Sequence, residues 1–161
     1  MQKPASLRAA IAETLPALAR DPDRLRMWVD KGQVRATGTP SPGFEWVYTL
    51  SLYISEYTDH PAILVHLVNQ WLATNQPDLL LSRSGYAFEA EIVDDKTFDL
   101  LFELPLTEAA IVTAATDGGW NIEHPGEPDP LLPDELPLSN PPGTLREIWR
   151  NADPDERIVP V

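Results

Sequence analysis

Cysteine is the first residue type that this sequence lacks. None of the 161 residues is cysteine, which excludes disulfide bonds, thiolate nucleophiles and cysteine-ligated zinc or iron–sulfur sites. A chain of this length fits one domain, which buries about two thirds of the surface that the unfolded chain exposes. We therefore expect side-chain packing to hold the fold together.

Basic side chains are scarce as well. The sequence has 12 lysines and arginines against 25 aspartates and glutamates, for a net charge of −13. Such a surface repels phosphate backbones and anionic lipid headgroups. We expect no direct nucleic-acid readout and no membrane partner, and we interpret the local basic group as solvated charges around a hairpin: Arg20, Arg24, Arg26, Lys31 and Arg35.

Long hydrophobic runs and chemistry-bearing motifs are also missing. No apolar stretch reaches the roughly 18 residues of a membrane span, and residues 1–18 lack the apolar run of a signal peptide, so we expect a cytoplasmic product. The sequence has no P-loop, G-x-G-x-x-G or G-x-S-x-G motif. Its histidines, His60, His66 and His124, are too far apart to place two imidazoles on one helix face. We expect no catalytic residue, no cofactor and no metal.

One carboxylate cluster is the alternative to that expectation. Its members are Glu89, Glu91, Asp94, Asp95, Asp99 and Glu103. A hydrolase would use Asp94, Asp95 and Asp99 to hold a hard cation or to transfer protons. The simpler interpretation is a solvated strand face followed by an ordinary turn.

The clearest pattern that is present is a long alternation over residues 44–55. Six even-numbered positions there are all large and apolar, which predicts one buried face of a strand: Phe44, Trp46, Tyr48, Leu50, Leu52 and Ile54. A similar alternation over residues 25–30, then Lys31-Gly32 and residues 33–36, predicts a tight hairpin. Residues 86–92 and 98–106 predict a second hairpin, and residues 120–123 a short strand.

Two segments have helical spacing instead. Residues 3–18 form an amphipathic pattern that Pro16 interrupts, and a second pattern starts near Asp59 and His60 and ends before Pro77. We predict an α+β fold: two main helices packed on a mostly antiparallel sheet of about five to seven strands.

The composition changes after His124. Nine of the 17 prolines lie between Pro125 and Val161, and proline-rich chain is extended and partly preordered. We predict an α+β domain over residues 1–124 and an extended arm over residues 125–161, with a possible short helix at 144–150.

Large apolar side chains outside the predicted core are candidate interface anchors. Trp28 and Trp120 fall on polar strand faces, and tryptophan is enriched where protein surfaces bury each other. In the arm, Leu145, Ile148 and Trp149 lie on one side of the possible helix and are expected to dock on an adjacent subunit or a neighbouring protein. Burial under the protein's own loops is the alternative for Trp28 and Trp120.

Several segments together resemble a known family. They are Lys3–Ala9, Asp21–Arg26, Phe44–Leu50, Trp71–Asp78 and Leu104–Glu108. In this order they are similar to the tail completion protein R family of Peduovirus-type phages with contractile tails. The likeness spans roughly Lys3 to Glu123.

This resemblance implies a structural role in finishing a tail at its head-proximal end. Related tail terminators form six-membered rings, so a homohexamer is expected, with tail tube, sheath and neck or head-connector proteins as partners. The protein would be made in the host cytoplasm and end in the virion, in a full phage or a headless tail-like particle. The alternative is a transient assembly adaptor or chaperone that is absent from the finished particle.

Overall fold

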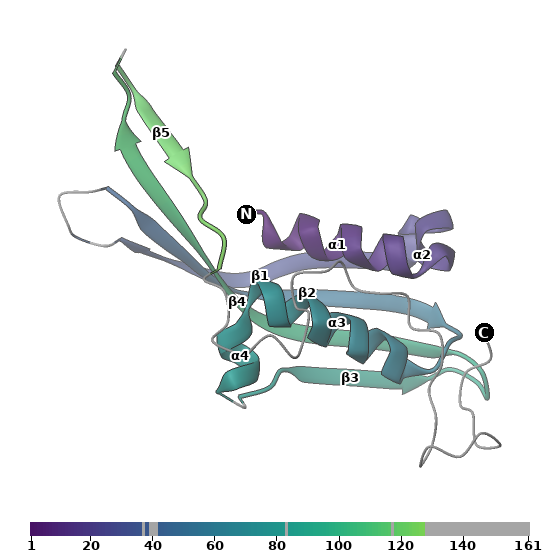
Figure 1. The fold of residues 1–161 in the computed structure, drawn as a ribbon. Helices are drawn as coiled ribbons and strands as arrows, with labels where there is room; N and C mark the ends of the chain where they lie inside the picture. Colours follow the sequence, from purple (N-terminus) through teal and green to yellow (C-terminus); the bar gives the residue numbers. More distant parts are fainter. Residues whose placement is uncertain (37, 39–41, 83, 117, 128–161) are drawn as a thin grey trace, which may run out of the picture.

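Two long helices lie on one face of an antiparallel sheet (Figure 1). The computed structural model describes residues 1–36, 38, 42–82, 84–116 and 118–127, and within these the sheet has five strands. The α+β class predicted from the sequence is confirmed. The predicted helix at 144–150 lies outside the described residues.

The first helical segment is divided as its proline predicts. Helix α1 spans Lys3–Thr14 and α2 spans Pro16–Arg20, followed by the 3-10 turn η1 at Pro22–Arg24. Pro16 has no amide hydrogen to continue α1, but it is well suited to start a new helix. Leu7 and Ile11 of α1 are fully buried against the sheet.

The second helical segment begins and ends where the sequence predicts. Helix α3 spans Pro61–Asn75, and the His60 ring accepts a hydrogen bond from the Ala62 amide as its N-cap. The short helix α4, Pro77–Leu81, follows directly. Leu64, Leu67, Val68 and Leu72 of α3 are buried in the core.

The sheet has the strand order β1-β2-β4-β3, and β5 pairs with the far end of β4. The strands are β1 (Leu25–Ala36), β2 (Phe44–Tyr57), β3 (Ala87–Ile92), β4 (Phe98–Ala114) and β5 (Trp120–Glu123). In the core, Leu50 lies opposite Leu104 and Leu52 opposite Phe102. All four side chains are buried beneath the helices.

The predicted hairpin at Lys31-Gly32 is wrong. Strand β1 continues from Leu25 through these residues to Ala36 and pairs with β2 along its length, with a register shift between Val29 and Gly32. A Cβ at Gly32 would lie 3.2 Å from the Cβ of Tyr48. Gly32 therefore serves a close approach of two strands at a bulge, and not a turn.

Strand β4 is longer than the predicted 98–106 segment. It runs for 17 residues and absorbs the apolar residues from Ala109 to Ala114. Pro105 lies within it, just past the last position that pairs with β3. Two residues on, the Thr107 amide donates to Oε1 of Gln76 at 3.0 Å, so this edge of β4 faces a side chain instead of a strand. A proline, which has no amide hydrogen, is tolerated on such an edge.

Candidate subunit interface

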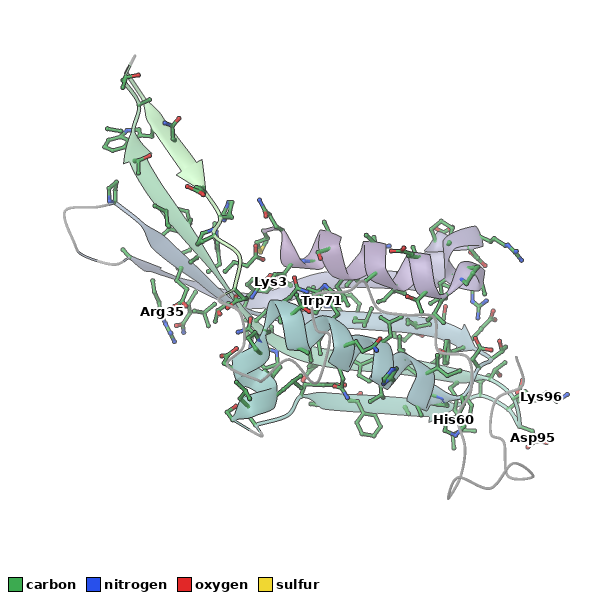
Figure 2. All side chains as sticks on the ribbon, viewed as in Figure 1. Lys3, Arg35, His60, Trp71, Asp95 and Lys96 are labelled. Atoms are coloured by element: carbon green, nitrogen blue, oxygen red, sulfur yellow. The ribbon has the colours of Figure 1, made fainter. Side chains whose placement is uncertain are left out.

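A projecting part of the sheet, here called the wing, carries several exposed large apolar side chains. It consists of residues 31–36, 44–47 and 108–114, at the ends of β1, β2 and β4, together with β5. Figure 1 shows the β4–β5 and β1–β2 hairpins diverging beyond the N-terminal end of α1. Arg35, labelled in Figure 2, lies on the β1 part of the wing.

The β4–β5 hairpin presents large apolar side chains to solvent. Trp120 is 65% exposed and Ile122 is 59% exposed. They lie opposite Ala114 and Val112, so both project from the same face of the hairpin. Gly118 and Gly119, both with positive φ, precede β5 in its turn. The candidate residue Trp120 thus lies beside a second apolar side chain that sequence reasoning did not select.

Trp28 has different surroundings. It lies on the sheet face opposite the helices and is 40% exposed. Its indole Nε1 donates to Oδ1 of Asp30 at 2.9 Å, and Oδ2 of Asp30 accepts from the Ser51 hydroxyl at 3.0 Å. The ring is therefore held in place by a polar network before any partner binds.

The structure does not bring Trp28 and Trp120 together. Trp28 lies opposite Ser51, which lies opposite Glu103, whereas Trp120 lies opposite Ala114. From 103 to 114 is eleven residues of β4, or about 35 Å of strand at 3.3 Å per residue. The two tryptophans belong to separate surfaces. Leu145, Ile148 and Trp149 lie outside the described residues, so their docking stays a prediction.

A buried polar junction supports the wing where it leaves the core. The Lys3 ammonium donates to Oε1 of Gln76 at 2.8 Å and forms an ion pair with Glu127 at 2.5 Å. Figure 2 shows Lys3 at this point, close to the base of the wing. Gln76 caps the C-terminal end of α3 and also bonds Thr107 of β4. The junction thus joins α1, α3, β4 and a residue beyond the predicted boundary at 124.

Glu108 forms the other half of this junction. It is only 5% exposed, and its carboxylate accepts hydrogen bonds from the Tyr48 hydroxyl and from the backbone amide of Gln2. Burial raises the pKa of Tyr48, and the hydrogen bond to Glu108 raises it further. Sequence reasoning missed Glu108. The signal was present, because Glu108 is the one acidic residue among the even-numbered apolar positions from Leu100 to Val112.

Two members of the carboxylate cluster, Asp94 and Asp99, accept hydrogen bonds that hold local structure. Asp94 accepts from the Lys96 and Thr97 amides in the β3–β4 turn, and the hydrogen bond from Lys96 is the main reason that its pKa is lowered. Asp99 accepts from the Tyr53 hydroxyl at 2.6 Å and the Glu56 amide at 2.8 Å. Across the described ranges, no three histidine or acidic side chains are grouped so that they could hold a metal ion.

No helix in the described ranges is both long enough and apolar enough to cross a membrane.

The similarity of this chain to known proteins extends over all the residues that the structure describes. A family model described as P2 phage tail completion protein R (GpR) matches residues 1–128. The chain is 35% identical over 142 residues to Tail completion protein R of Escherichia phage P2, covering 86% of this chain and 91% of that protein. No solved structure matches.

Proposed function

This chain belongs to the P2 phage tail completion protein R family, as its sequence resemblance predicted, and from that premise we propose that it completes the tail of a contractile phage or phage-like particle. The family match carries the proposal, because residues 1–128 include every described helix and strand. We infer a structural component of the virion, located at the head-proximal end of the tail.

We further propose that several copies form a ring, six-membered as the resemblance implies. A ring repeats one head-to-tail contact, so each copy presents two different surfaces. The family match includes the wing, whose Trp120 and Ile122 are exposed together. We assign the β4–β5 face of the wing to contacts with neighbouring tail or neck proteins, because tryptophan is enriched among interface anchors and Trp120 is exposed beside a second apolar side chain.

The C-terminal arm is a second proposed contact. Its apolar residues Leu145, Ile148 and Trp149 stand in a proline-rich, polar segment. We propose that they dock on an adjacent subunit or a neck protein. Truncation after Glu127 removes them and retains the ion pair with Lys3. The truncated chain is expected to fold and to assemble poorly.

The test is complementation of particles made without this protein. Negative-stain images of such particles are expected to show tails of wrong length or tails without heads, and the wild-type chain is expected to restore normal ones. Trp120→Ala combined with Ile122→Ala is expected to fail, whereas Leu81→Ala, at an exposed apolar residue that ends α4 outside the wing and the edge strands, serves as a matched control. Normal particles without the protein would contradict the proposal.

Mass spectrometry of purified particles separates the two roles in assembly. A component of the tail remains in the finished particle, at a constant ratio to the tube protein. A transient adaptor restores assembly and is absent from the product, which would overturn the proposed location in the virion.

A further inference from the structure

Strands β1 and β3 are the two edge strands of the main sheet, so their outer edges lie on opposite sides of the molecule. The order β1-β2-β4-β3 places them at opposite edges, and every step between them is antiparallel. Three antiparallel steps make β1 and β3 run in opposite directions. A β3 strand from a second copy, placed beside β1 by translation across the sheet, would therefore extend the same antiparallel pattern.

Strand β3 is an unusually apolar exposed edge. All six of its residues are exposed, and on the helix-bearing face Phe88 is 66% and Ile92 is 71% exposed. Phe88 also lines an apolar hollow of about 390 Å³ beneath α3 and α4. Exposed edge strands with apolar side chains are templates for pairing with another chain. This edge needs cover, which the described chain does not supply.

The backbone amide and carbonyl groups of β3 that point away from β4 belong to alternate residues of the strand. The Val93 amide donates to the Thr97 carbonyl in the adjoining turn, at 3.0 Å, so it points toward β4. Residues an even number away point the same way. The amide and carbonyl of Ala90 therefore point outward, together with those of Phe88 and Ile92, whose side chains lie on the helix-bearing face.

The outer edge of β1 has the same relationship between backbone and side chains. The Leu25 carbonyl accepts from Nη1 of Arg8 on α1 at 3.1 Å, so it points away from β2. The backbone groups of Met27 and Val29 point outward with it, and these side chains also lie on the helix-bearing face. On both edges, the residues whose backbone groups point outward have their side chains on the helix-bearing face. The two strands can therefore pair in a way that leaves the helices of both copies on the same side of the joined sheet.

Charge and strand length together select one register among those that this rule permits. With Met27 opposite Ala90, Arg26 lies opposite Glu91 on the open face, and all six residues of β3 lie opposite residues of β1. A shift of two residues in one direction places Asp30 opposite Glu89, which is repulsive. The opposite shift places Arg26 opposite Glu89 but carries the end of β3 past Leu25, where β1 begins. In the favoured register, Trp28 also covers the side chain of Glu89.

We propose that the β1 edge of one copy pairs with the β3 edge of a second copy, antiparallel, with Met27 opposite Ala90. This rests on the proposed ring and names the contact between its subunits. The two edges are complementary in charge and lie on opposite sides of one chain, so no chain can satisfy its own pair. Such a contact is head-to-tail and repeats from copy to copy.

Analytical ultracentrifugation of the purified full-length chain tests the pairing. The wild-type chain is expected to form an oligomer. Arg26→Glu places like charges opposite each other and is expected to weaken association by about tenfold or more. The reciprocal variant Glu91→Arg is expected to do the same, and the double variant R26E/E91R to restore association to within about threefold of wild type.

A backbone variant tests the strand pairing itself. Ala90→Pro removes an outward amide hydrogen, a change that an edge strand tolerates, and is expected to abolish association while circular dichroism and the melting temperature stay close to wild type. Ala90→Thr, which keeps the amide, is the matched control and is expected to associate normally.

Three outcomes overturn the pairing: a monomeric wild-type chain at high micromolar concentration, normal association of Ala90→Pro, or no rescue by the double charge swap. The last result would leave Arg26 and Glu91 as charges that keep the edges solvated. Complementation distinguishes this failure from that of the proposed function, because variants that restore tails without pairing refute the edge contact alone.

Discussion

The ammonium of Lys3, in the first turn of α1, donates a 2.8 Å hydrogen bond to the side chain of Gln76 at the end of α3. The two residues are 73 positions apart, and both are buried. The bond ties the first helix to the point where α3 ends and β4 passes into the wing. The position of the wing relative to the core therefore depends on the ammonium of Lys3, in the first turn of the first helix.

Replacement of Lys3 tests this dependence. Lys3→Met keeps much of the packing but removes the cation that Gln76 and Glu127 share. Gln76 keeps its bond to the Thr107 amide, whereas Glu127 loses its ion pair, so we expect the free energy of unfolding to fall by about 1–3 kcal/mol. Urea denaturation measures the change. Lys96→Met, in the exposed β3–β4 turn labelled in Figure 2, is the control and is expected to change stability by less than about 0.5 kcal/mol. Equal effects would contradict the role given to the junction.

Two buried tyrosines are expected to respond oppositely to loss of the hydroxyl. Tyr48 donates to buried Glu108, so Tyr48→Phe should lower the free energy of unfolding by about 1–3 kcal/mol. The Tyr57 hydroxyl is buried and has no hydrogen-bond partner among the described residues. Tyr57→Phe should therefore be neutral or raise stability by up to about 1 kcal/mol. Denaturant titrations that reverse this order would refute the assignment.

Alkaline pH should destabilise the fold through the same side chains. Burial raises the pKa of Tyr57 and of Tyr48. In the unfolded chain, tyrosine loses its proton near pH 10. Above about that pH the unfolded state binds fewer protons than the folded state, so stability falls as pH rises. We expect thermal melting to be steady below about pH 9 and to decline above about pH 10, less steeply in Tyr57→Phe. An unchanged decline in that variant would contradict the prediction.

Glu56 adopts a backbone conformation that suits glycine. Its φ is +52°, at a register shift between β2 and β4, where the Asp99 carboxylate accepts from its amide. Left-handed backbone costs a non-glycine residue about 1–2 kcal/mol. Glu56→Gly should therefore raise the free energy of unfolding by about 0.5 kcal/mol. Glu103→Gly, at an exposed position within β4, is the control and should lower it by about 0.5–1 kcal/mol. Parallel losses in both variants would show that no strain is relieved.

Acid should weaken the bulge around Glu56. The hydrogen bond from Tyr53, and then that from the Glu56 amide, lower the pKa of Asp99. A carboxyl whose pKa is lower in the folded state adds stability above its unfolded value, near pH 4, and this is lost as pH falls. Asp99→Asn should thus show a shallower loss of stability between about pH 4 and 2. Identical acid profiles would exclude Asp99 as a contributor.

The sequence predicted the elements that one local pattern defines. The alternation from Phe44 to Ile54 identified β2, because only one register turns all of its large apolar side chains to the same face. Those from Tyr48 to Ile54 are buried in the core, and Phe44 and Trp46, in the wing, are half-buried. The positions of Pro61 and Pro77 bounded α3 for the same local reason, since proline starts helices and ends them. Such features need no knowledge of the rest of the fold.

Features that depend on distant partners were not predictable in this way. Lys31-Gly32 has the composition of a turn, and only the approach of Tyr48 from β2 shows that it is a bulge. Alternation also does not tell which strands pair, so the edge positions of β1 and β3 came from the structure. Glu108 was visible as an anomaly, but its partners Tyr48 and Gln2 lie far away in the chain.

Strand β4 is hydrogen-bonded to β2, β3 and β5, and so belongs to both the core and the wing. A pull on the tip of the wing acts lengthwise on this strand, across ladder bonds that lie perpendicular to it. Those bonds share the load in shear instead of opening one after another. A lengthwise force applied at Trp120 is thereby distributed over the hydrogen bonds that join β4 to β2 and β3 in the core.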